Sequence, residues 1–432
     1  MKKLKHKKLT PGQVIALGFA AVILTGALLL FLPFTHNEGV NVSAIDALFT
    51  STSAVCVTGL IAVDTADTFN AFGQTVVALL IQIGGLGVTS IGIGFIIFSG
   101  KKINMRERLL AKEGLNYSSF KGVLALVKAV LYMTLCFEFV GMLLSFTVFI
   151  KDYPFWHALG ISAFHSVAAF NNSGFDILGG LRNLIPYRDN IVLNLTTCFL
   201  IIFGGLGFFV IRDVFKTRSF RKFSLHSKVV ITVTVFLLLI GTLLLKATEE
   251  VTWLGAFFQS TSARTAGFST YPIGTFSNAG LLTLCVLMFI GASPGSTGGG
   301  IKTTTFFVLM QAVLSASTNK PCAAFKRTLS SEIVRKAFVI TLLASGVVCT
   351  STFLLCVLEP QTEFMKLLFE TVSAFGTVGL STGITPNLSA ASKAVIVLTM
   401  YIGRLGPLTV ASLWIFKPDS EVNYAEEPVT IG

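Results

Sequence analysis

Four glycines recur in the same local pattern, and they are the residues whose placement suggests chemistry. Each glycine lies ten residues after a phenylalanine, follows small residues at the fifth and sixth positions of its window, and precedes Leu or Phe. A fourfold match at one spacing is not expected by chance, so the pattern indicates an internal repeat. The four windows are Phe49–Leu60, Phe164–Phe175, Phe257–Phe268 and Phe369–Leu380.

The chemistry that such glycines allow is the binding of a cation by backbone oxygens. Glycine adopts backbone angles that other residues avoid, which lets a loop aim its carbonyl groups inward. Carbonyl oxygens can then replace the hydration shell of a cation. No ring of Asp or Glu stands beside the glycines, so selectivity should come from dipoles. The predicted filter takes three residues from each window: Val57, Thr58 and Gly59; Asn172, Ser173 and Gly174; Thr265, Ala266 and Gly267; Thr377, Val378 and Gly379.

The alternative is that these glycines only let helices pack closely. Helix packing would explain neither the polar residues around the glycines nor the short segments ahead of them, so we favour the filter.

The composition indicates whether the helices that position these loops lie in water or in a lipid bilayer. The chain has 432 residues with 12% charged residues and a mean hydropathy of +0.77, far more apolar than a soluble domain. Its apolar blocks are about 20 residues or longer, the length that crosses a bilayer as a helix. The sequence therefore predicts a polytopic membrane protein. Clear blocks are Val14–Leu32, Val123–Ile150, Val229–Leu245 and Ala337–Leu358.

The segments just ahead of the glycines are too short to cross the membrane. The chain would therefore dip into the bilayer and return, which is tolerated only where protein or water covers the backbone. A short helix there directs the negative end of its dipole at the loop, which favours a cation. The predicted pore loops are residues 44–60, 155–175, 252–268 and 363–380.

A second landmark begins 24 to 30 residues beyond each of these glycines. It reads GGLG, GGLG, GASPG and GRLG, starting at Gly84, Gly204, Gly291 and Gly403. We place these landmarks inside apolar second helices. The fold class predicted is an all-α polytopic membrane protein with eight transmembrane helices and four re-entrant pore helices in pseudo-fourfold arrangement around one pore. The repeats are residues 1–105, 106–218, 219–330 and 331–432.

The net charge of +12 does not indicate nucleic acid, because the basic residues are segregated. The positive-inside rule puts the basic loops and both termini in the cytoplasm of a cell-membrane protein. By our count 23 of the 33 Lys and Arg residues fall in five stretches: Met1–Lys8, Lys101–Lys121, Arg212–Lys228, Lys320–Lys336 and Lys417. The seven cysteines are scattered and form no CxxC pair, so neither a disulfide framework nor a metal site is expected.

The third unit contains a break that is predicted to act as a gate. Pro294 and a cluster of glycines cannot sustain a helix through residues 291–305. A polar loop below the filter could block the pore. Arg404 lies at a depth where a charge usually lines a cavity or finds a partner, and we expect it to hydrogen-bond carbonyls of this loop. The predicted gate comprises Gly291, Ala292, Ser293, Pro294, Gly295, Ser296, Thr297, Gly298, Gly299, Gly300, Lys302 and Arg404.

Two further charged residues are predicted to support the filter. Arg264 lies in the third filter loop and would repel cations if it faced the pore. We expect it to point backward toward an acid, with Glu370 as the first candidate and Glu138 as the second. Lys302 is expected to reach cytoplasmic water at the end of the gate loop.

The sequence resembles the Ktr/Trk/HKT family of potassium transporters, and specifically the Ktr membrane subunit, over essentially the whole chain. The matching motifs are VTGL (Val57–Leu60), NNSGF (Asn171–Phe175), RTAGF (Arg264–Phe268) and GTVGL (Gly376–Leu380). Glycine at all four filter positions goes with potassium selectivity in this family. Trk members carry extra N-terminal helices that this chain lacks, which favours the Ktr branch.

The resemblance implies more than the residues themselves show. It implies potassium uptake through a bacterial cell membrane, a non-enzymatic protein without an organic cofactor, and an intramembrane loop in the third unit. It also implies a homodimer with one pore per subunit, docked on a cytosolic RCK-type ring that binds nucleotide. Membrane lipid is the other expected partner.

Three rival functions remain in view. GSTGGGIKT (Gly295–Thr303) resembles a phosphate-binding loop, but Ile301 interrupts the motif and the motif interrupts a membrane helix. An alternating-access transporter would show inverted or parallel repeats and broken helices. A sodium-selective or sodium/potassium transporter of the same fold is the nearest alternative, with sodium as a further transported ion.

Overall fold

The structure is a computed structural model that describes residues 9–98, 105–114 and 123–412. The predicted basic stretches at Met1–Lys8 and Lys417, and most of Lys101–Lys121, lie outside the described residues. The described chain is helical apart from one two-stranded hairpin, in which β1 (Ala323–Ala324) pairs with β2 (Arg327–Thr328). The predicted all-α character is therefore confirmed, and the chain's fold matches that class.

Four long helices have the length and composition of membrane spans. They are α1 (Pro11–Phe31), α7 (Val123–Phe149), α11 (Leu225–Thr248) and α15 (Ser331–Leu358). Their outward apolar side chains are exposed, with Leu24 at 64% and Leu342 at 62% of full exposure. Apolar residues exposed in this way on long helices are stable against hydrocarbon and would be costly in water.

A short helix follows each long one, and these short helices form the centre of the molecule. Phe49, Phe258 and Phe369 on them are among the largest fully buried side chains. The same helices also carry buried hydroxyls: Ser51 Oγ donates to the Ile23 carbonyl at 2.7 Å, one of three such bonds to a long helix. The short helices are α2 (Ala44–Cys56), α8 (Phe155–Phe170), α12 (Trp253–Ser262) and α16 (Phe364–Gly376).

The second apolar helices end at the landmark glycines instead of passing through them. The helices α4 (Ala71–Leu86) and α5 (Val88–Phe98) meet at 96°, and α9 (Ile191–Leu206) and α10 (Phe208–Thr217) meet at 98°. The helix α17 (Ala390–Leu405) likewise ends before α18 (Pro407–Ser412). The predicted position of the landmarks inside the second helices is therefore corrected, because the landmarks lie at the ends of these helices.

Close packing on the short helices accompanies the breaks. A Cβ atom on Gly84 would lie 2.0 Å from the Val55 carbonyl oxygen, and one on Gly204 would lie 1.9 Å from that of Phe170. The second helix thus touches the backbone of the short helix and turns away at a glycine with positive φ. The three turning glycines have φ between 82° and 90°: Gly87, Gly207 and Gly406.

In the third unit the break is longer. The helix α13 (Asn278–Phe289) and the helix α14 (Thr303–Thr318) are separated by residues 290–302. By length and composition the described chain has four membrane-spanning helices, or six if each bent pair counts as one span. The predicted count of eight transmembrane helices is not confirmed by the described residues and stays a prediction.

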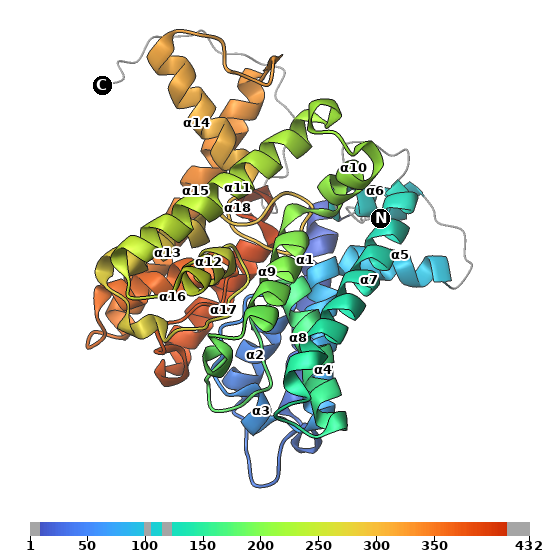
Figure 1. Ribbon diagram of the computed structural model, residues 1–432, viewed down its shortest axis with the longest axis vertical. Helices are drawn as coiled ribbons and strands as arrows, with labels where there is room; N and C mark the ends of the chain where they lie inside the picture. The colour runs from blue at the N-terminus through green and yellow to red at the C-terminus, as the bar shows by residue number, and fades with distance from the viewer. Residues whose placement is uncertain (1–8, 99–104, 115–122, 413–432) are drawn as a thin grey trace, which may run out of the picture.

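The remaining elements are short connections. They are α3 (Thr65–Thr68), α6 (Met105–Gly114) and 3-10 turns at Pro33–Thr35, Ile185–Tyr187, Phe220–Lys222, Ile273–Thr275 and Thr385–Asn387. In Figure 1 α14 and the adjoining part of α15 project from the top of the molecule, while α3 lies near the bottom.

Candidate cation filter and gate

The four predicted filter glycines meet in one closed ring. Each packs so tightly on the filter of another unit that a Cβ atom at its position would lie 2.2 to 2.8 Å from a carbonyl oxygen there. The ring therefore has room for glycine only. The contacts run in order around it: Gly59 with Ser173, Gly174 with Ala266, Gly267 with Val378, and Gly379 with Thr58.

The backbone of each filter loop is left-handed at two positions. The glycines have φ between 69° and 93°, and the residues two positions earlier have φ between 49° and 76°. For Val57 and the two threonines in this set, positive φ is a strained conformation that the surrounding structure must hold. The earlier residues are Val57, Asn172, Thr265 and Thr377.

Three of the short helices end in the same way. Thr58 N–H donates to the Ser53 carbonyl at 2.8 Å, and equivalent bonds spanning five residues end α8 and α16. This pattern is a Schellman motif, which satisfies the last carbonyls of a helix. In the third unit the Ser262 carbonyl accepts from Ala266 N–H, four residues on, at 2.9 Å and from Gly267 N–H, five residues on, at 3.3 Å.

The shorter third loop corrects the position of one landmark. Phe258, which is fully buried, occupies the place that Phe49, Phe164 and Phe369 take in the other units, whereas Phe257 is only partly buried. The ten-residue spacing in the third window is thus a sequence coincidence, and the structural spacing there is nine residues.

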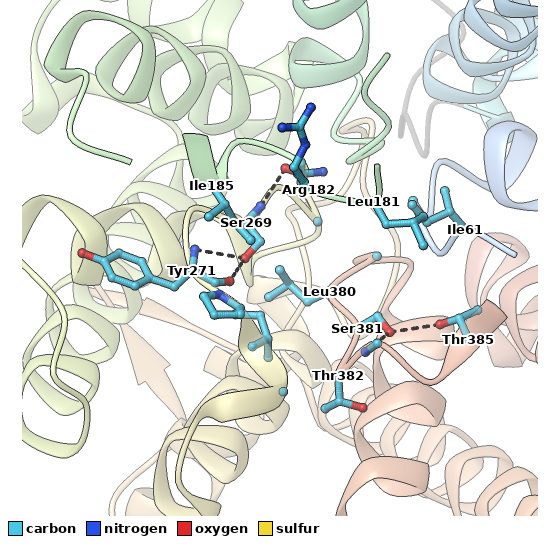
Figure 2. Close-up of a pocket in the computed structure, with 18 of the residues that line it drawn as sticks. Ile61, Leu181, Arg182, Ile185, Ser269, Tyr271, Leu380, Ser381, Thr382 and Thr385 are labelled. Atoms are coloured by element: carbon cyan, nitrogen blue, oxygen red, sulfur yellow. Dashed lines mark hydrogen bonds between the residues drawn. The ribbon is translucent and has the colours of Figure 1, made fainter. Parts of the chain in front are cut away.

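A cavity of about 290 Å³ opens outside the ring. Figure 2 shows its wall, with Ile61, Arg182, Tyr271 and Thr382 drawn from well-separated parts of the chain. Three of the four filter glycines line this cavity: Gly59, Gly267 and Gly379. No group of three His, Cys, Asp or Glu residues that could hold a metal ion occurs in the described ranges.

One acid lies near this outer opening. Asp176 follows the second filter glycine, and burial raises the pKa of its carboxyl from 3.8 to about 6. Its carboxylate accepts hydrogen bonds from Leu178 N–H and Asn183 Nδ2, each at 3.0 Å. Hydrogen bonds and the charge of Arg182 oppose the effect of burial, and the charge of Asp64 adds to it.

The predicted gate loop lies directly against the inner end of the ring. A Cβ atom on Gly298 would lie 2.0 Å from Thr265 Oγ1, and one on Gly299 would lie 2.4 Å from Thr377 Oγ1. Thr297 Oγ1 donates to the Gly204 carbonyl at 3.2 Å, which ties the loop to α9. Below the loop is a second cavity of about 470 Å³.

Arg404 contacts the loop as expected. Its guanidinium donates to the Thr297 carbonyl and also to the carbonyls of Gly84 and Gly85 at the end of α4. One side chain therefore joins the gate loop, α17 and α4.

Lys302 turns back onto the loop. Its Nζ donates to the carbonyls of Gly298 at 2.7 Å and Gly299 at 3.2 Å, and its side chain also lines the lower cavity. Lys302 thus contacts the gate loop to which it was assigned, and its reach to cytoplasmic water stays a prediction.

The expected pairing of Arg264 is wrong. Arg264 is 7% exposed and its Nε has no hydrogen-bond partner. Among the described residues it forms no ion pair with Glu370 or Glu138. Glu370 instead accepts hydrogen bonds from Ser381 Oγ, Thr382 N–H at 3.1 Å and Thr385 Oγ1 at 2.9 Å. It supports the exit of the fourth filter loop without the arginine.

Two polar clusters have no counterpart among the sequence predictions. Lys393 Nζ lies 2.7 Å from Asp46 Oδ1, and both side chains are largely buried. Separately, Glu138 Oε1 accepts a bond from Asn171 Nδ2 at 3.0 Å, and Gln82 bonds to both residues. No local motif signals either cluster, because their members come from distant parts of the chain.

The sequence matches the model of the TrkH family, described as cation transport proteins, over residues 12–251 and 223–424. It is 38% identical to Ktr system potassium uptake protein B of Bacillus subtilis, covering 100% of this chain and 99% of that protein. It is 39% identical to the potassium/sodium uptake protein NtpJ of Enterococcus hirae, with the same coverage.

The fold is similar to that of a solved transporter. The crystal structure of the potassium transporter TrkH from Vibrio parahaemolyticus superposes with a TM-score of 0.73 at 20% identity, covering 96% of this chain and 87% of that one. The predicted resemblance is confirmed, and the chain belongs to the TrkH family of cation transport proteins, in its Ktr-type branch.

Proposed function

We propose that this protein takes up potassium across the cell membrane through a channel-like pore. The observation that carries the proposal is the closed ring of four glycine loops, in which each loop packs on the next. A cation passing through this ring would exchange water for the backbone carbonyls of the twelve predicted filter residues. The ring has no carboxylate of its own, so dipoles supply the attraction.

The four-unit organisation belongs to this proposal. The order of long helix, short helix, glycine loop and broken second helix recurs along the described chain, which supports the predicted repeats. We take the basic stretches and both termini to be cytoplasmic, as the positive-inside rule predicts.

The gate is proposed to be the loop of residues 291–302. Its glycines seal the inner end of the ring by direct contact with Thr265 and Thr377, and Arg404 holds it there. Opening would withdraw the loop into the lower cavity and free the ion path. A cytosolic nucleotide-binding ring is the proposed regulatory partner, and a second copy of the chain is the proposed dimer partner. The printed names of the Ktr relatives describe them as parts of a system.

The second candidate is a transporter that carries sodium with potassium. The printed name of the Enterococcus hirae relative, a potassium/sodium uptake protein, supports this candidate. The measurement that decides between the two candidates is competition between the two ions.

The test is rubidium-86 uptake into proteoliposomes that hold the purified chain, with potassium or sodium competing outside. The variant Gly267→Ser adds atoms where a Cβ would lie 2.2 Å from the Val378 carbonyl oxygen. We expect potassium to compete better than sodium in the wild type and to lose that advantage in the variant. Gly346→Ser is the control, because nothing lies within 4 Å of its Cβ position. Equal competition by sodium in the wild type would favour the second candidate.

A further inference from the structure

One of the four filter glycines differs from the others in its hydrogen bonds. The Gly174 carbonyl accepts a bond from the side-chain amide of Asn183, with Nδ2 and the oxygen 3.1 Å apart. Among the hydrogen bonds of the described residues, no donor reaches the carbonyls of the other three filter glycines. Gly174 is also the filter glycine that does not line the outer cavity, whereas Asn183 does. The ring is therefore asymmetric at its outer end.

Asn183 is held firmly in this position. Its Oδ1 accepts bonds from Leu184 N–H and Ser269 N–H, both at 2.9 Å. Its Nδ2 also donates to Asp176 Oδ2 at 3.0 Å. The backbone φ of Asn183 is +48°, a left-handed conformation that asparagine tolerates better than most residues.

The oxygen and the nitrogen of the Asn183 amide thus bind different filter segments. The oxygen joins the segment after the second filter to Ser269, two residues beyond the third filter glycine. The nitrogen donates to the second filter glycine itself. One side chain therefore fixes the distance between two adjacent filter loops at their outer ends.

We propose that Asn183 is a specificity-determining residue of the filter, which holds the outermost ring at a size suited to potassium. The inference rests on the proposed potassium pore. A carbonyl that already accepts a hydrogen bond is restrained from moving toward an ion. Sodium, the smaller ion, needs the carbonyls to close in, so restraining one of the four disfavours sodium more than potassium.

Two variants separate this role from its alternatives. Asn183→Asp keeps the oxygen that accepts from Leu184 and Ser269 but removes the donor to Gly174. Asn183→Gly removes the donor without adding charge, and glycine suits the positive φ. Asn190→Asp is the control: Asn190 caps α9 on the same segment, and aspartate keeps that cap while adding the same charge.

The measurement is thermal unfolding of the purified full chain in potassium or sodium chloride, with choline chloride keeping the ionic strength constant. It reports ion binding without requiring an open gate. The readout is the ratio of sodium to potassium concentrations that give half of the maximal rise in melting temperature. We expect both Asn183 variants to lower this ratio roughly threefold to tenfold, the effect of losing about one hydrogen bond. Asn190→Asp should leave it unchanged, and unfolding in choline alone verifies that each variant folds.

Each result decides the question. A lowered ratio in both Asn183 variants supports the proposal. A lowered ratio in Asn183→Asp alone would assign the effect to charge and overturn the proposal. Unchanged ratios in both variants would show that Asn183 only stabilises the loop, which also overturns the proposal. If the wild type itself shows no preference between the ions, the potassium filter fails, and this inference fails with it.

Discussion

At the scale of single residues, the two cations that contact the gate loop bind carbonyl groups instead of acids. Arg404 and Lys302 both donate to the gate loop, whose carbonyls have no helical partners. A buried charge without compensation is very costly, so these contacts stabilise both the cation and the loop. Sequence reasoning found Arg404 because a charge in an apolar helix stands out, but it gave Arg264 an acidic partner that the fold does not place nearby.

Arg404 provides the first residue-scale prediction. Arg404→Ala removes the donors to Thr297 and Gly84, so the closed gate loses hydrogen bonds to a charged group worth about 1.5–3 kcal/mol. We expect rubidium uptake into proteoliposomes to rise roughly tenfold or more. Arg188→Ala, which removes an arginine from an exposed ion pair, is the control and should not change uptake. Unchanged uptake in Arg404→Ala would refute its role in holding the loop.

Asp176 provides a prediction for pH. Its folded-state pKa of about 6 lies above the ordinary value of 3.8, so its contribution to stability is present at low pH and is lost as pH rises through 6. Between pH 5 and 7 the melting temperature of the wild type should fall relative to that of Asp176→Asn. Glu359 should not change the melting temperature between pH 5 and 7, because hydrogen bonds from Ser392 and Ser389 lower the pKa of its carboxyl below 4.5. Parallel curves for the two proteins would contradict the assignment.

At the scale of elements, the short helices were predictable and the broken helices were not. The short apolar segments and their caps are local properties, and all four short helices appear where the windows place them. The landmark GGLG continues into apolar residues on both sides, so it looks like one helix. Beside the break α4 and α9 contact the backbone of the short helices, and a single sequence does not show that contact.

This close approach can be tested with alanine. In Gly204→Ala the new Cβ would lie 1.9 Å from the Phe170 carbonyl oxygen, at the end of α8. Overpacking against backbone typically costs about 1–3 kcal/mol, so the melting temperature should fall by several degrees. Gly160→Ala lies on α8 itself with nothing within 4 Å, and should have little effect. Equal melting temperatures for the two variants would show that α9 can move away at low cost.

At the scale of the whole molecule, the ring closes only if the fourth filter loop packs against the first. Gly379 packs on the first filter at Thr58. Lys393 of α17 and Asp46 of α2, separated by 347 positions, form an ion pair behind this contact. A repeat detected in the sequence predicts that such a contact exists. It does not predict which residues make it, because Lys393 and Asp46 carry no shared motif and each lies in an ordinary loop or helix start.

The ion pair makes a prediction that concerns the closed ring. The side chains of Lys393 and Asp46 are 9% and 17% exposed, so removing one partner leaves a buried charge and should cost about 3 kcal/mol or more. Lys393→Met should therefore lower the melting temperature strongly, whereas Lys366→Met, in the partly exposed pair with Glu363, should not. The double variant Lys393→Met, Asp46→Asn removes both charges and should recover much of the loss. If the loss of stability in the double variant equals the sum of the losses in the two single variants, the ion pair does not stabilise the closed ring. Packing of the lysine stem would then account for the loss in Lys393→Met.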